Sequence, residues 1–488
     1  MSPIIAAVAR HAAERPQAPA LGDGLNLLGY AALQAELEAA RAVLREARPR
    51  VLALAMENSP AWAVADLAAL AESVPVVPLP AFFTAGQQAH ALRDAGADWM
   101  LTDDSAGQFL TLVAAGCEVA ERIEHTLAGR RLMLLRLEGA KPVRLPRGCA
   151  KITYTSGTTG RPKGVCLGAG AMAAVASSLA RAAELTPQDR HLAALPLATL
   201  LENVGGIYAP LLAGACAVLP RLRAVGLAGA ARFEPGMLLT ALWGQEASSV
   251  ILTPQMLNGL VAALETGLLA PRSLHFVALG GAPAAPRLLQ RASRAGLPVY
   301  EGYGLSECAS VVALNTRRAR RPGSVGRPLP HARISIAPDG EILVSGATLL
   351  GIAGEAEGAI PGPWRTGDLG YLDAEGFLHI TGRKKNMFIT SFGRNVAPEW
   401  VERELTLHPA IAQAALFGEG RPWNVAVIVP RGVLEPEAIE RAIAEANAEL
   451  PDYAQVRAWL LADASFTPDN GQLTINGRLK REAIRAAY

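Results

Sequence analysis

The stretch Tyr154–Val165 reads Tyr-Thr-Ser-Gly-Thr-Thr-Gly-Arg-Pro-Lys-Gly-Val and decides the fold. Its hydroxyl side chains interleave with glycines, which let the backbone turn tightly and bring its N–H groups close to a ligand. Lys163 adds a compact positive charge that suits a phosphate. The stretch lacks the spacing of a Walker A loop, in which Gly, four residues and Gly-Lys-Ser/Thr follow one another. It therefore predicts a phosphate-binding loop of another kind.

The composition limits the classes of protein to which this chain can belong. A chain of 488 residues is too long for one compact core and predicts two or three domains. A hydrophobic content of 51% excludes a disordered chain, and a net charge of +2 gives no reason to expect a nucleic-acid partner. Five cysteines without a Cys-x-x-Cys pair indicate a reducing compartment, so we expect a cytoplasmic protein. Neither a signal peptide nor an apolar run of the ~20 residues that span a membrane is found, so no transmembrane segment is expected.

Helical and strand patterns alternate along the first half of the chain. The expected helices and strands are helices at 33–44, 62–72 and 87–95, and strands at 51–55, 74–79, 99–102, 249–252, 274–279 and 297–300. Alternation of this kind implies parallel or mixed sheets flanked by helices. After residue 384 a compact stretch has its own pattern, with a hairpin of 414–417 and 425–429. We expect an α/β fold with a large N-terminal body, residues 1–383, and a small mobile C-terminal α+β domain, residues 384–488.

Six segments in a fixed order resemble the acyl-adenylate-forming superfamily of AMP-binding enzymes, which contains acyl-CoA synthetases, luciferases and peptide-synthetase adenylation domains. The opening loop is the first. The others are Gly280–Pro283, Glu301–Glu307, Trp364–Asp368, Ser391–Glu399 and Phe466–Arg481. The closing segment is most similar to long-chain fatty acyl-CoA synthetases.

The resemblance implies a nucleotide site. Tyr303 would stack on adenine, Ser306 would donate to the α-phosphate, and Glu307 would hold Mg²⁺ against the phosphates. Asp368, expected on a turn, would bind the ribose hydroxyls, with Arg383 adding a second contact. The residues that the resemblance assigns to ATP and AMP are Thr155, Ser156, Gly157, Thr158, Thr159, Gly160, Lys163, Gly280, Gly281, Ala282, Glu301, Gly302, Tyr303, Gly304, Ser306, Asp368 and Arg383.

The resemblance also implies a second group of residues near the C-terminus. Lys480 would be the adenylation lysine that bridges the acyl carboxylate and the α-phosphate, acting with Glu307 and Lys163. Lys385 occupies the position of the family's hinge residue, whereas Lys384 is expected in solvent. Gly393 and Arg394 would face the incoming thiol.

Acyl specificity is expected in the segment Leu195–Asn203. The resemblance assigns Thr199, Leu200, Asn203 and Gly302 to the acyl pocket, although Leu200 and Leu201 fit core packing equally well. An apolar, roomy wall suits a fatty or polyene acid. The aspartate that amino-acid-activating relatives carry near Leu197 is missing, which argues against an amino-acid substrate.

These expectations describe an ATP- and Mg²⁺-dependent ligase of fatty acid metabolism. A carboxylic acid would form acyl-AMP and pyrophosphate, and a thiol, with CoA preferred, would then displace AMP. The alternative acceptor is a phosphopantetheinyl acyl-carrier protein, because Arg394-Asn395 is more usual among relatives that load carrier proteins. The remaining alternative is a catalytically silent nucleotide-binding regulator.

Overall fold

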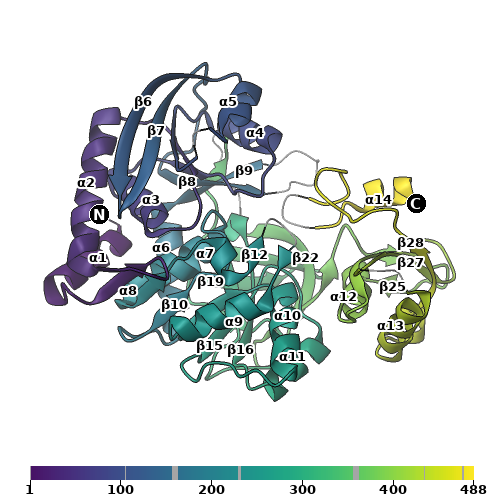
Figure 1. Ribbon diagram of the computed structural model, residues 1–488. Helices are drawn as coiled ribbons and strands as arrows, with labels where there is room; N and C mark the ends of the chain where they lie inside the picture. Colours follow the sequence, from purple (N-terminus) through teal and green to yellow (C-terminus); the bar gives the residue numbers. More distant parts are fainter. Residues whose placement is uncertain are drawn as a thin grey trace.

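The computed structural model describes residues 2–104, 106–155, 163–228, 232–355, 362–432, 435–474 and 478–488. Figure 1 shows a large body formed by the first four-fifths of the chain, with the C-terminal segment set against one side of it. The C-terminus lies on the far side of the molecule from the first helices (Figure 1). None of the helices in these ranges is long and apolar enough to cross a membrane.

The first sheet of the body has the strand order β21-β9-β8-β4-β3-β5-β7-β6. Its strands are β3 (Leu52–Ala55), β4 (Val76–Pro78), β5 (Trp99–Thr102), β6 (Glu118–Leu127), β7 (Arg130–Glu138), β8 (Cys149–Thr155), β9 (Lys163–Gly168) and β21 (Gly351–Ile352). The central strands β8, β4, β3 and β5 run parallel, as expected for buried strands between helices. The helices of this part are α2 (Tyr30–Ala47), α3 (Pro60–Glu72), α4 (Ala85–Ala95) and α5 (Phe109–Ala115).

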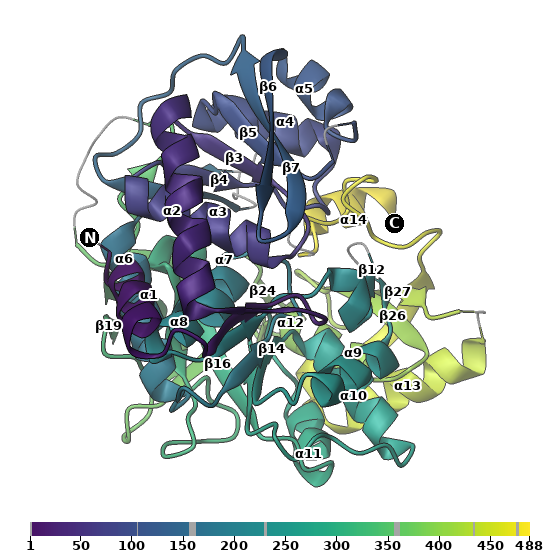
Figure 2. The same ribbon diagram turned by 60° about the vertical axis from the view of Figure 1, so that its left-hand side comes forward.

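The second sheet has the order β18-β17-β16-β15-β14-β10-β11-β1-β2. Its strands are β1 (Pro19–Gly22), β2 (Leu27–Gly29), β10 (Arg190–Leu192), β11 (Cys216–Val218), β14 (Ser249–Leu252), β15 (Phe276–Leu279), β16 (Val299–Leu305), β17 (Ser310–Leu314) and β18 (Arg327–Pro328). The helical segments around it are α1 (Pro3–Glu14), α6 (Ala169–Ala182), α7 (Leu200–Glu202), π-helix η1 (Asn203–Tyr208), α8 (Ala209–Ala213), α9 (Pro235–Gly244), α10 (Pro254–Glu265) and α11 (Pro286–Arg294). Figure 2 shows α9, α10 and α11 gathered beside this sheet. A short pair, β12 (Leu227–Ala228) and β13 (Arg232–Phe233), lies nearby in sequence.

A third sheet and the C-terminal segment complete the molecule. The third sheet, in the order β19-β20-β22-β23, consists of β19 (Ala332–Ile336), β20 (Glu341–Gly346), β22 (Trp364–Leu372) and β23 (Leu378–Arg383). Beyond it follow β24 (Phe388–Ile389), β25 (Asn395–Val396), α12 (Pro398–Thr406), β26 (Ile411–Phe417), β27 (Asn424–Pro430), α13 (Pro436–Ala448), β28 (Val456–Leu461) and α14 (Arg481–Ala487). Two clusters of buried side chains within this last segment give it a core of its own.

Most elements expected from the pattern are present. The face of Leu33, Leu37, Ala40 and Leu44 is the buried face of α2, and β14 has the predicted bounds. The expected hairpin is β26 and β27, which pair antiparallel.

Two elements differ from the expectation. The strand expected to end at Tyr300 continues to Leu305, because its glycines pair with β17. Asp368 lies within β22 and not on a turn, because it pairs in register with Arg383 of β23.

Candidate active site

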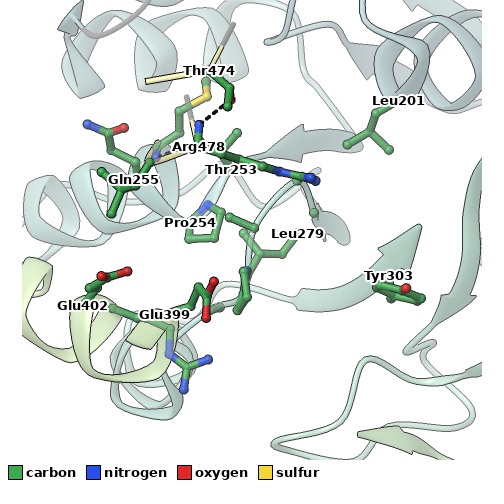
Figure 3. Close-up of a pocket in the computed structure, with 18 of the residues that line it drawn as sticks. Leu201, Thr253, Pro254, Gln255, Leu279, Tyr303, Glu399, Glu402, Thr474 and Arg478 are labelled. Atoms are coloured by element: carbon green, nitrogen blue, oxygen red, sulfur yellow. Dashed lines mark hydrogen bonds between the residues drawn. The ribbon is translucent and has the colours of Figure 1, made fainter. Parts of the chain in front are cut away.

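A continuous cleft of about 3300 Å³ lies between the body and the C-terminal segment. It brings together residues that are up to three hundred positions apart in the chain, as the sequence predicts. The predicted site residues that line it are Lys163, Thr199, Leu200, Gly280, Gly281, Ala282, Glu301, Gly302, Tyr303, Gly304, Ser306, Glu307, Asp368, Arg383, Lys385 and Lys480. In Figure 3, Tyr303 and Leu279 reach the cleft from the body, while Thr474, Arg478, Glu399 and Glu402 reach it from the C-terminal segment.

Tyr303, Asp368 and Arg383 form one hydrogen-bonded group in this cleft. The Tyr303 hydroxyl donates to Asp368 Oδ2 at 2.6 Å, and Arg383 Nε lies 2.6 Å from Asp368 Oδ1. Asp368 is buried, and its backbone N–H is held by the Thr366 hydroxyl. Burial, with the neighbouring Asp368 charge, raises the pKa of Tyr303 well above its ordinary value, so the hydroxyl stays a donor. The carboxylate is thus fixed in orientation before any ligand arrives.

Glu307 and Lys163 supply the other charges expected at a polyphosphate. Glu307 lies in a short 3₁₀ turn after β16, half-buried at the cleft. Lys163 begins β9 and pairs at 3.4 Å with Glu355, which follows the neighbouring strand β21. No group of three or more His, Cys, Asp or Glu that could hold a metal is found among the described residues. One carboxylate with free coordination positions fits Mg²⁺ that takes its remaining ligands from phosphates and water.

The C-terminal segment brings a second cation to the cleft besides Lys480. The Arg478 guanidinium interacts electrostatically with Asp368, Glu307 and Arg383. Lys480 lines the cleft, but its ammonium has no ion pair or hydrogen bond with another described residue. The following Arg481 is anchored, because it makes a bidentate pair with Glu402 of α12 at 2.6 and 2.7 Å. Sequence reasoning passed over Arg478, although it stands in the same motif.

Other predicted residues lie outside the described part of the chain or do not line the cleft. The loop residues 156–162 lie outside the described residues, and so does the side chain of Thr155. Gly393 and Arg394 are exposed and lie outside the cleft lining. Lys384 is exposed as expected, paired with Asp339 at 2.7 Å.

The assignment of Asn203 to the acyl pocket is wrong. Its side chain is only 1% exposed, donates to Asp66 at 2.9 Å and accepts from Lys151. It is therefore part of a buried polar network behind the pocket wall. Leu200 lines the cleft and also packs in the main core, and its role in the acyl pocket stays a prediction.

Comparison with known proteins decides the family. The family model for the AMP-binding enzyme matches residues 8–352, and that for the AMP-binding enzyme C-terminal domain matches residues 385–488. The chain belongs to the AMP-binding enzyme family. Recognition of the family from the sequence is thereby confirmed.

The relatives of this AMP-binding enzyme are CoA ligases, which is the predicted enzyme class. It is 31% identical over 357 residues to the 2-succinylbenzoate–CoA ligase of Bacillus subtilis, covering 68% of each chain. It is 34% identical over 242 residues to a long-chain-fatty-acid–CoA ligase of Mycobacterium bovis, a match that spans 43% of this chain and 40% of that protein. The solved o-succinylbenzoate CoA synthetase of Bacillus subtilis with its acyl-adenylate covers 98% of this chain and 97% of its own, with a TM-score of 0.77 and 25% identity. The predicted fold class is thereby confirmed, whereas the domain boundary at 383 stays a prediction.

In this AMP-binding enzyme the C-terminal segment docks onto the body through charged groups. Glu301 of β16 interacts electrostatically with the half-buried Arg403 of α12, and Arg287 of α11 lies 3.7 Å from Glu445 of α13. Burial raises the pKa of Glu301 from 4.5 to about 7, while Arg403 and Arg320 oppose that shift. The ionised carboxylate is therefore less stable here than in the unfolded chain.

We expect Glu301→Gln to remove a pH-dependent loss of stability. The folded state favours protonated Glu301, so the wild type loses stability as pH rises from about 4.5 through about 7. The glutamine variant should be more stable than the wild type by about 1–3 kcal/mol at pH 8 and equal to it at pH 4. Denaturation of both proteins at several pH values measures this difference. A difference that does not change with pH contradicts the assignment.

Proposed function

We propose that this protein is an AMP-forming acid–thiol ligase that activates an apolar carboxylic acid of medium or long chain. The observation that carries the proposal is the meeting of Lys163, Glu307 and the Asp368 group with the C-terminal cations in one cleft. The family membership and the CoA ligases among the relatives support it.

The first half-reaction joins the acid to AMP. A carboxylate oxygen of the acid attacks the α-phosphorus of ATP, the bond to the β-phosphate oxygen breaks, and pyrophosphate leaves. Asp368 would accept hydrogen bonds from the ribose hydroxyls, Tyr303 would stack on adenine, and Lys163 would hold the phosphates. Glu307 would hold Mg²⁺, which neutralises phosphate charge. A cation from the C-terminal segment would stabilise the charge that develops at the α-phosphate.

The second half-reaction transfers the acyl group to a thiol. The thiol sulfur attacks the acyl carbonyl, and AMP leaves with its phosphate oxygen. Gly393 and Arg394 lie outside the cleft in this pose. Rotation about Lys385 would remove the C-terminal cations and present these residues, so that one site serves both steps. CoA is the proposed acceptor, because the named relatives are CoA ligases.

A panel of acids tests the proposal. Pyrophosphate release is measured with acetate, octanoate, longer fatty acids and amino acids, first with CoA and then with a holo acyl-carrier protein at the same thiol concentration. We expect rates to rise with chain length, since each buried CH₂ contributes about 0.8 kcal/mol. Better activity with acetate or an amino acid refutes the acid class, and thioester formed only on the carrier protein refutes CoA as acceptor. Absence of pyrophosphate release with every acid favours the silent regulator.

A further inference from the structure

The cleft wall beside the segment Leu195–Asn203, where the acyl pocket is expected, is not apolar along its whole length. Ser249 of β14 and His191 of β10 line the cleft, although each is only 4% exposed. Ser249 Oγ lies 3.0 Å from His191 Nδ1, and His191 Nε2 lies 2.8 Å from Glu202 Oε1. Glu202 is fully buried, and its other oxygen accepts the Leu195 backbone N–H at 3.0 Å. A connected polar group thus sits in a wall that is otherwise hydrophobic.

The register of the sheet places Ser249 on the side of β14 that η1 covers. Ser249 and Ile251 point to the same side of β14, and their in-register neighbours on β15 are Phe276 and Ala278. All four line the cleft. A Cβ added to Gly205 of η1 would come within 2.8 Å of Ile251 Cδ1, so this side faces η1.

Ser249 lies at the opposite end of β14 from the predicted nucleotide-binding residues Gly280 and Gly281, which follow β15. Thr253 and Gly280 directly follow the C-terminal ends of β14 and β15, whereas Ser249 is the first residue of β14. Three steps along a strand at ~3.3 Å each span about 10 Å, the length of an extended acyl chain of roughly eight carbons. The sequence Ser–His–Glu is that of a hydrolytic triad, but here it would meet the tail of the acid and not its carboxyl group.

The donor and acceptor at each hydrogen bond of Ser249, His191 and Glu202 follow from the carboxyl group of Glu202. Glu202 Oε2 accepts the Leu195 N–H, and in the tautomer that carries its hydrogen on Nε2, His191 donates to Glu202 Oε1. In the neutral imidazole Nδ1 then accepts, so the Ser249 hydroxyl donates to it. The two lone pairs of Ser249 Oγ remain available for a donor in the cleft. A second carboxylate on the acid would instead lie close to the carboxyl group of Glu202, which offers it no positive charge.

We propose that Ser249, held by His191 and Glu202, binds a hydroxyl group at the far end of the acyl substrate. This inference rests on the proposed function and narrows its substrate class to acids with an apolar middle and a distal hydroxyl. Ser249 is a specificity residue that acts only on the substrate tail.

Pairs of acids that have the same size and differ in their terminal group test the inference. Pyrophosphate release is measured for 6-, 8-, 10- and 12-hydroxy acids against methyl-terminated acids of equal size, such as nonanoate for 8-hydroxyoctanoate, and against octanedioate. We expect kcat/KM to favour the hydroxy acid by about 10-fold at one length near eight carbons, the value of one buried hydrogen bond. A preference for the methyl-terminated acids at every length, or for octanedioate, overturns the inference while the proposed function stands. Absence of turnover with all of these acids refutes both.

Three variants distinguish binding of the substrate hydroxyl by Ser249 from a structural role of this residue. Ser249→Ala should abolish the preference between the paired acids, whereas Ser249→Cys, which keeps the volume and accepts weakly, should reduce it. Ser178→Ala is the matched control, because Ser178 is also buried on α6 but lies outside the cleft lining. It should leave the preference unchanged. Equal losses for both acids of a pair in Ser249→Ala and Ser249→Cys would mean that Ser249 has a structural role only.

Discussion

Replacing Arg478 with alanine is expected to slow acyl-AMP formation by about two to three orders of magnitude. In this pose the guanidinium interacts with Glu307 and Asp368, where the phosphates and ribose of ATP are proposed to lie. Its charge would stabilise the transition state at the α-phosphorus. The segment that carries it is proposed to leave the cleft between half-reactions, so thiolysis of supplied acyl-AMP should keep nearly the wild-type rate. Pyrophosphate release and thiolysis of synthetic acyl-AMP, measured separately, give the two rates.

Lys480→Ala is the matched comparison for this prediction. The resemblance assigns the adenylation role to Lys480, which lies two residues further on and lines the same cleft. A larger loss in Lys480→Ala than in Arg478→Ala would return the role to Lys480. Arg478→Lys should recover part of the adenylation rate, because a point charge remains. Equal losses in both half-reactions for Arg478→Ala would show that Arg478 supports the structure and not the first step.

The local sequence pattern was sufficient to predict the helices and strands that bury one face or are buried throughout. The i, i+4 apolar positions of α2 and the short run of β14 are of this kind. It failed where strand pairing overrides local preference. Gly302 and Gly304 suggest a loop, yet their backbones pair with β17. Asp368 follows Thr-Gly, yet its pairing with Arg383 extends β22 through it.

Site residues that belong to a sequence motif were predictable. Residues whose role depends on hydrogen-bond partners far away in the sequence were not. Tyr303, Glu307, Asp368 and Arg383 meet because their segments end at the same cleft. Asn203 resembled a pocket residue because it is polar in an apolar segment. Its partners Asp66 and Lys151 are 137 and 52 positions away, so nothing local reveals that they satisfy it.

That buried network is the place where a single substitution should most reduce stability. Lys151 Nζ donates to Asp66 Oδ1 at 2.8 Å and to the Tyr208 hydroxyl at 3.1 Å, and the Lys151 and Asp66 side chains are 2% and 1% exposed. Tyr208 also donates to Asp66 Oδ2 at 2.6 Å. Burial lowers the pKa of Lys151, and Asp66 opposes this shift. The Asp66 carboxylate thus stabilises the ammonium form of Lys151 against the cost of its burial.

We expect Asp66→Ala to lower the free energy of unfolding by about 3–5 kcal/mol, because it leaves the Lys151 charge buried without its partner. Glu124→Ala is the control, since it breaks the exposed 2.8 Å pair with Arg131 and should cost at most about 1 kcal/mol. Chemical denaturation of both variants measures the difference. Lys151→Met combined with Asp66→Leu should recover much of the loss, because neither charge then remains buried. If Asp66→Ala is no less stable than Glu124→Ala, the network does not hold β8 against η1. Since β8 leads directly into the phosphate-binding loop, we expect the same substitution to weaken ATP binding as well.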